Sequence, residues 1–212
     1  METLVASTGI LPKLAQAAFF IAALVVWFRA TDRAKGFKRL FALSLSFHGL
    51  YAALLTAAQG YVWSKDAFTK LFLSLPIEAE APLPALLSPF RSIFLSDHGY
   101  FAFYSASRFW VPALFAVSCA LVAYGVFRFA NRSESTKTDA LIFALGVSIV
   151  GYPACIAFAA LAFLFILGQG LWKASTGRSG LSFALPAALA ALIVILVGAR
   201  LVAFLGLSAI AL

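Results

Sequence analysis

Five stretches of the chain are predominantly apolar and long enough to cross a lipid bilayer as helices. The hydrocarbon core of a bilayer is about 30 Å thick and a helix rises about 1.5 Å per residue, so a span needs about 20 apolar residues. The sequence predicts an all-α polytopic membrane protein with five transmembrane helices, in which residues 1–212 form a single membrane domain. The predicted spans are about 10–28, 40–60, 109–127, 140–168 and 181–200.

The composition leads to the same class of protein. Hydrophobic residues make up 63% of the chain and charged residues only 11%, as is typical of membrane proteins. The net charge of +8 does not indicate nucleic-acid binding, because most basic residues lie at the ends of apolar stretches, where they meet anionic lipid headgroups. We therefore expect the lipid bilayer as the environment and no nucleic acid as a partner.

The distribution of basic residues predicts an orientation in the membrane. Five basic residues lie in 29–39 and three in 128–137, whereas the connection at 172–180 carries two. Cytoplasmic connections carry an excess of Lys and Arg, so we place the first two connections in the cytoplasm and 172–180 outside. The N-terminus is then outside and the C-terminus is cytoplasmic. For Arg200 the preferred interpretation is that it reaches the cytoplasmic headgroups, and the alternative is a span that lies farther toward the C-terminus and buries it. Size and topology favour a bacterial inner membrane.

Residues 61–108, between the second and third spans, form the one long external segment. Apolar residues within 66–75 recur at helical spacing opposite polar ones, which predicts an amphipathic helix too short to cross a bilayer. Ser64 is a candidate N-cap for this helix. A second short helix is expected at 89–95, and the third span is expected to extend outward as a helix from Tyr100. We expect both short helices to lie on the membrane surface or against the ends of the spans.

His48 is the only histidine within a predicted span, and it lies near the middle of that span. Ser44, a small residue four positions earlier, leaves room for a flat macrocycle, so one interpretation is a haem or chlorophyll ligand. No second histidine is expected at the same depth, because His98 lies in the external segment. The preferred interpretation is a neutral histidine that is hydrogen-bonded to a neighbouring span. We expect no cofactor and no metal.

Few other residues suggest chemistry. Asp97, His98 and Arg108 form the one external group with acid–base potential, although a turn followed by an interfacial arginine is the preferred interpretation. No acidic residue lies clearly within a span, which disfavours a proton-coupled transporter, since such proteins usually embed Asp or Glu. Cys119 and Cys155 lie in separate spans without CxxC spacing and are expected to be packing residues.

Small residues are dense in the last two predicted spans. In lipid, small residues let helices approach closely, and their spread over several helix faces predicts contacts with more than one neighbour. The expected packing positions are Gly146, Gly151, Ala184, Ala188, Ala191 and Gly198.

These features predict a non-catalytic integral membrane subunit or scaffold of a larger membrane complex, such as secretion or translocation machinery. Its partners would be other membrane protein subunits or further copies of the chain. One alternative is a channel or transporter for a small solute. A further alternative is a membrane enzyme that acts at the outer surface through Asp97, His98 and Arg108. The scarcity of ionisable groups within the spans favours the first function.

Overall fold

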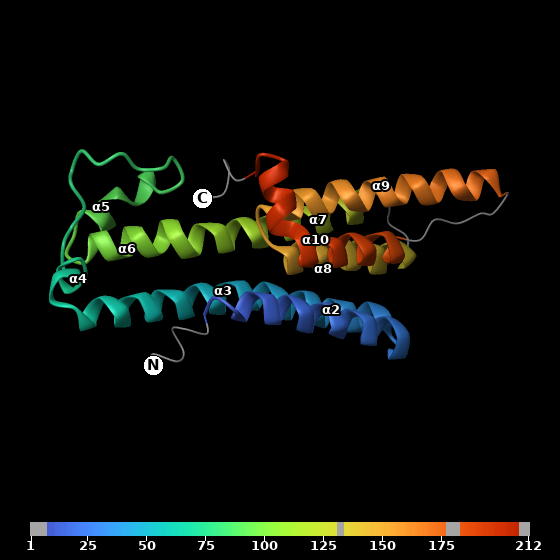
Figure 1. Ribbon diagram of the computed structural model, residues 1–212, viewed down its shortest axis with the longest axis horizontal. Coiled ribbons are helices and arrows are strands. Elements are labelled where there is room, and N and C mark those ends of the chain that lie inside the picture. Colours follow the sequence, from blue (N-terminus) through green and yellow to red (C-terminus); the bar gives the residue numbers. More distant parts are fainter. Residues whose placement is uncertain (1–7, 131–133, 177–182, 208–212) are drawn as a thin grey trace. The chain divides into compact units, whose positions relative to one another are not determined.

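The computed structural model describes residues 8–130, 134–176 and 183–207, and the regular structure within them is entirely helical (Figure 1). Within these described ranges, five helices are long and apolar enough to cross a membrane, which confirms the predicted all-α class with five helices of transmembrane length. These are α2 (Leu11–Arg29), α3 (Arg33–Lys65), the continuous helix α6–η2–α7 (Gly99–Phe129 in its apolar part), α9 (Ala154–Ser175) and α10 (Ala184–Phe204).

The chain divides into two compact units, which are described separately. The first unit consists chiefly of Gly49–Leu114, and the second contains Gly9–His48 and Phe115–Ala211. The helix α3 passes from the second unit into the first, and α7 (Val111–Ala130) passes from the first into the second.

In the second unit, α2 and the beginning of α3 form an antiparallel hairpin. Asp32 caps α3, since its Oδ1 accepts a hydrogen bond of 2.9 Å from the backbone N–H of Lys35, which satisfies one of the free donors of the first turn. Farther along, the rings of Phe19 and Phe47 meet edge to face with centroids 6.0 Å apart. The two helices are therefore packed side by side over several turns.

The stretch 140–168 forms two helices and not the single span that the sequence analysis predicts. The helix α8 (Glu134–Val150) ends before Gly151, whose φ of +70° is strained for any residue with a side chain. A cis peptide bond joins Tyr152 to Pro153, and α9 starts at Ala154. The sequence analysis expected Gly151 and Pro153 to kink a helix, whereas they lie in a turn that ends one helix and starts another.

The helices α8 and α9 fold back on each other. The rings of Phe143 and Phe163 have centroids 5.9 Å apart, although 20 residues in one helix would separate them by about 30 Å. A Cβ built at Gly146 would overlap the ring of Phe158, so the two helices touch where α8 has no side chain. This reversal brings the chain back toward the end of the unit from which α8 came.

The reversal also changes the predicted arrangement of the last helix. The ring of Phe183, just before α10, lies 5.5 Å from that of Phe127 in the last turns of α7. Ala184 shares a groove with Trp27, close to the turn between α2 and α3. The helix α10 therefore begins at the end of the unit where α7 ends, whereas the sequence analysis predicted that the fifth span begins at the opposite end. The sides of the membrane on which the connection before α10 and the C-terminus lie stay predictions. Which end faces the cytoplasm stays a prediction.

The helix α8 is the core of the second unit. From Ala140 to Val150 every residue except Ile142 is buried, because α8 packs against both α9 and α10. The facing side of α10 is made of small residues, whereas its large residues Leu185 and Leu196 are 60% and 73% exposed. This division of small residues inward and large residues outward is expected for a helix that faces lipid.

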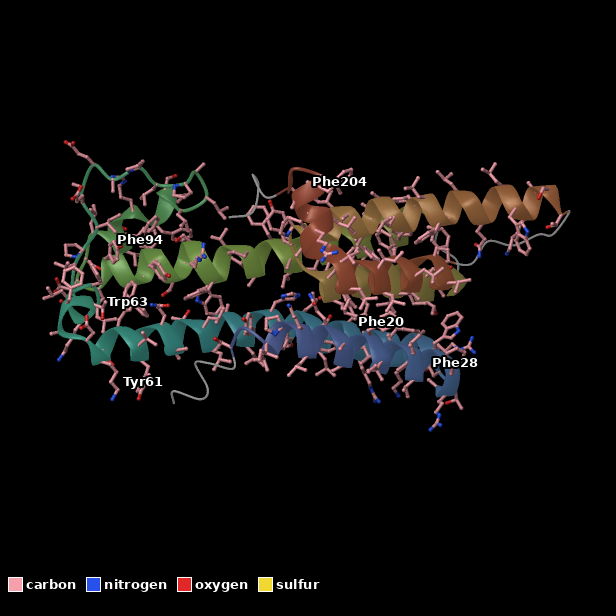
Figure 2. All side chains as sticks on the ribbon, viewed as in Figure 1. Phe20, Phe28, Tyr61, Trp63, Phe94 and Phe204 are labelled. Atoms are coloured by element: carbon pink, nitrogen blue, oxygen red, sulfur yellow. The ribbon has the colours of Figure 1, made fainter. Side chains whose placement is uncertain are left out.

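The first unit is organised around Trp63, near the end of α3 (Figure 2). Its ring lies 5.7 Å from that of Phe72 and 4.9 to 6.1 Å from three aromatic rings of α6 (Gly99–Ser105). Such ring pairs stabilise a fold beyond the area that they bury. The aromatic cluster therefore fixes the start of the connection against α6, whose three contributing residues are Tyr100, Phe101 and Tyr104.

Two short helical segments lie in the connection between α3 and α6, near their predicted places. The helix α4 (Ala67–Leu71) is shorter than predicted, and its N-cap is Asp66, which accepts a hydrogen bond of 2.9 Å from the N–H of Thr69. Ser64, the predicted cap, lies inside α3 because that helix continues to Lys65. The second segment consists of η1 (Ser88–Phe90) and α5 (Arg91–Phe94).

Candidate functional site

The helix α8 ends at about half the depth of the second unit. His48, which contacts its last turn, lies nine residues after Arg39, or about 14 Å along α3. Val150, the last residue of α8, lies eleven residues after Asp139, or about 16 Å along α8. Both distances are near half of the about 30 Å core of a bilayer.

A helix that ends at this depth needs hydrogen-bond donors. The last four carbonyl groups of an α-helix lack partners within the helix, and lipid tails supply none. His48 Nε2 lies 2.9 Å from the carbonyl oxygen of Ser148, and since a carbonyl only accepts, Nε2 carries the proton. Gln16 Nε2 donates to the carbonyl of Val150 at 3.4 Å. The N–H of Gly151 donates to Val147 at 3.1 Å.

Side chains of α2 and α3 thus cap the end of α8. We name Gln16 and His48, with the carbonyl groups of Ser148 and Val150, the α8 cap. The sequence analysis preferred a hydrogen bond from His48 to a neighbouring span, and the structure identifies Ser148 as its partner. It missed Gln16, for which the only signal was an amide within an otherwise apolar stretch.

The surroundings of His48 do not fit a macrocycle. Ser44 is only 2% exposed, and its hydroxyl donates to the carbonyl of Phe41 at 2.8 Å. The Nε2 atom of His48 is already engaged by Ser148. A haem or chlorophyll would have to displace both the helices that cover Ser44 and the α8 cap.

The two cysteines meet in the second unit, which the sequence analysis did not predict. The thiol of Cys155, in the first turn of α9, lies close enough to that of Cys119 on α7 for the two to interact. Both are free thiols, and Cys155 is buried. Among the described residues, no group of three or more His, Cys, Asp or Glu side chains could hold a metal ion. The pair therefore serves as a contact between α7 and α9, close to the turn after α8.

Asp97, His98 and Arg108 do not come together as a catalytic group. His98 adopts a left-handed conformation with φ of 68°, and its Nδ1 atom contacts the carbonyl oxygen of Leu73. Arg108 lies in η2 (Ala106–Trp110), a π-helical turn that continues α6. Asp97 lies in the turn before α6, and Arg108 lies nine residues after Gly99 along the helix, which corresponds to about 14 Å.

The predicted packing residues lie at contacts within the chain. A Cβ at Gly198 would lie 3.1 Å from Val194 and 4.0 Å from Ala154 on α9. Ala184 and Ala191 are buried, and Ala188 lines a groove between helices. Since four of these six small residues are buried within the second unit, they do not by themselves support contacts with another protein.

Exposed apolar side chains lie instead on the connection of the first unit. This connection has its own small core, in which Ile77 and Phe94 are 7% and 4% exposed, and Arg91 donates to the carbonyl of Ala81 at 2.9 Å. Seven large apolar side chains nevertheless remain between 41% and 68% exposed. We name this set the outer apolar residues: Phe68, Leu71, Leu75, Leu86, Phe90, Ile93 and Leu95.

Comparison of the chain with protein-family models, with curated proteins and with solved structures finds no match.

Proposed function

We propose that the protein is a non-catalytic integral membrane subunit that helps to hold a larger complex together, such as secretion or translocation machinery of a bacterial inner membrane. The supporting observation is the set of outer apolar residues. The connection that carries them has its own hydrogen bonds and core, yet leaves these side chains uncovered. Exposed apolar groups on a structured segment are typical of interaction sites.

The length of α3 supports a location of these residues outside the bilayer core. Lys65, its last residue, lies 26 residues after Arg39, or about 39 Å along the helix. This exceeds the about 30 Å thickness of the hydrocarbon core, so α4 begins beyond it when Arg39 lies at the opposite interface. Burying one Leu or Phe side chain stabilises by about 1.5–3 kcal/mol, and a partner that covers several of them gains accordingly.

Co-purification tests the proposal. We expect Phe68→Ser and Ile93→Ser to lower the recovery of protein partners from mild detergent, measured by quantitative mass spectrometry. Lys70→Ser and Glu80→Ser are the matched controls, because they change exposed polar side chains of the same connection. Unchanged recovery with both apolar variants would contradict the proposal and indicate that the outer apolar residues face only lipid headgroups.

A transporter for a small solute is the second candidate, and it is favoured by the end of α8 at mid-depth. In several transporter folds, helices broken near the middle of the membrane bind substrates and ions at their ends. Flux into proteoliposomes that depends on Gln16 and His48 would support this candidate over the scaffold. An enzyme ranks lower, because Asp97 lies in the turn before α6 whereas Arg108 lies nine residues into the helix that starts at Gly99.

A further inference from the structure

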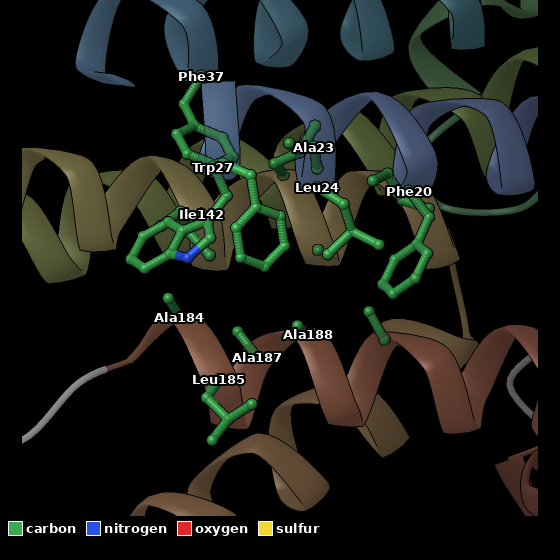
Figure 3. A pocket seen from close by; sticks show the side chains of 15 residues that line it. Phe20, Ala23, Leu24, Trp27, Phe37, Ile142, Ala184, Leu185, Ala187 and Ala188 are labelled. Carbon is green, nitrogen blue, oxygen red and sulfur yellow. The ribbon is translucent and has the colours of Figure 1, made fainter. Parts of the chain in front are cut away.

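A groove opens in the second unit between α2, α8 and α10 (Figure 3). Its volume is about 180 Å³, and its lining is apolar. Side chains of α2, among them Phe20 and Trp27, face Ala184 and Ala188 of α10 across it. Along α2 the lining extends from Phe20 to Phe28, which corresponds to about 12 Å.

The groove has a buried floor and an exposed apolar rim. On the floor, Leu145 of α8 and Ala187 of α10 are 2% and 3% exposed, whereas Phe28 and Leu185 at the rim are 76% and 60% exposed. Since α2 and α10 have the length and composition of spans, a rim of this kind opens toward lipid tails. Empty apolar cavities of about 150 Å³ take up small apolar guests rather than water.

One end of the groove lies beside a concentration of positive charge. The guanidinium carbon of Arg33 lies 4.8 Å from the ring centroid of Trp27, which lines the groove. The other basic side chains of the α2–α3 turn are exposed. Asp32 is the only acidic residue of 29–39, and one of its carboxylate oxygens accepts a hydrogen bond from the N–H of Lys35. The exposed basic residues are Arg29, Arg33, Lys35, Lys38 and Arg39.

We propose that this groove binds one acyl chain of an anionic phospholipid, whose phosphate contacts Arg33 and its basic neighbours. The positive charge beside the groove attracts the phosphate of an anionic lipid. It favours such a lipid over a zwitterionic one, whose ammonium group the same side chains repel, and over a neutral guest. A partner helix is about 10 Å wide or more, which exceeds what a groove of about 180 Å³ can take in. Basic pockets between membrane helices are known to bind anionic lipid headgroups.

The quenching of Trp27 fluorescence by brominated lipids tests the proposal. The full chain is reconstituted in phosphatidylcholine nanodiscs with a small fraction of either brominated phosphatidylglycerol or brominated phosphatidylcholine. The signal of Trp27 is obtained as the difference between the parent and Trp27→Phe. We expect stronger quenching by phosphatidylglycerol, and a roughly five-fold weaker apparent affinity for it in Arg33→Gln, since one basic residue contributes about that factor.

Two further variants separate the groove from general membrane contact. Ala188→Leu places a larger side chain in the groove and should abolish the preference, whereas Ala203→Leu on an exposed part of α10 should retain it. Lys70→Gln removes a charge of the first unit and should leave the preference unchanged. Equal quenching by the two lipids, or persistence of the preference in Ala188→Leu, would overturn the proposal. Absence of quenching by both lipids would also overturn it, because the groove would then be covered by protein.

Discussion

Replacement of His48 by Leu tests the α8 cap most directly. The variant introduces an apolar side chain of similar size and removes the N–H donor that lies 2.9 Å from the carbonyl oxygen of Ser148. This carbonyl is in the last turn of α8 and is left without an intrahelical partner. Ser148 is 1% exposed, so water cannot replace the lost donor without opening the helix contacts.

The expected loss follows from two bounds. An unsatisfied buried acceptor costs about 1–3 kcal/mol, whereas hydrogen bonds between membrane helices contribute about 0.6 kcal/mol on average. The lower figure applies where the unbonded group finds other partners. Because a helix-end carbonyl has none, we expect His48→Leu to lower the free energy of unfolding by about 2 kcal/mol. Gln16→Leu should cost less, because its hydrogen bond is 3.4 Å long.

Reversible unfolding in mixed micelles, followed by circular dichroism, measures these losses. His48→Gln retains a side-chain N–H and should recover part of the stability. Ser46→Leu on an exposed face of the same helix is the matched control and should be nearly neutral. A His48→Leu variant within about 0.5 kcal/mol of the parent would refute the reasoning, since it is below the cost of any orphaned carbonyl.

Three other changes have defined outcomes. Gly146→Ala should lower the free energy of unfolding by about 1–3 kcal/mol, because the added methyl group overlaps an aromatic ring of α9; an unchanged unfolding midpoint would contradict this packing. Gly99→Ala forces a methyl group onto a backbone carbonyl of α5 and should make the connection sensitive to limited proteolysis, whereas an unchanged digestion pattern would argue against the contact. In a chain without its native cysteines, single cysteines at Ser135 and Ser175 should react with an impermeant reagent from the same side of the membrane, and one at Ser7 from the other; reaction of Ser175 together with Ser7 would restore the single fourth span.

Hydropathy predicts the helices of transmembrane length but not the reversal after α8. A kinked span and a helical hairpin have the same apolar residues, and both place Gly and Pro near the middle. What separates them is the positive φ of Gly151 together with the contact between Gly146 and Phe158. Neither can be read from a sequence, because both depend on which face of α8 meets α9. The error in the position of α10 follows from this one difference.

The candidate site was predictable only in part for a related reason. A histidine within a span needs a partner, so the hydrogen bond of His48 could be expected, but its acceptor exists only because α8 ends there. Small residues predict close helix packing, but they do not specify whether the neighbouring helix belongs to the same chain or to another protein. In the structure Gly198 meets Ala154 of the same chain. The N-cap of α4 is Asp66 and not the predicted Ser64, because α3 continues to Lys65 through the position where the start of a new helix was expected.

The shortness of α8 has a consequence for the order in which the chain enters the membrane. Only eleven residues follow Asp139 before the helix ends, fewer than the about 17–25 that an independently inserted span needs. Its buried face is covered by α9 and α10, which leave the ribosome after it. During synthesis α8 therefore has to wait, shielded by the insertion machinery or held at the interface, until its later neighbours arrive. In a nascent chain that stops before α10, the face of α8 that α10 covers in the finished protein stays exposed. A membrane protease could recognise the incomplete chain by this exposed face.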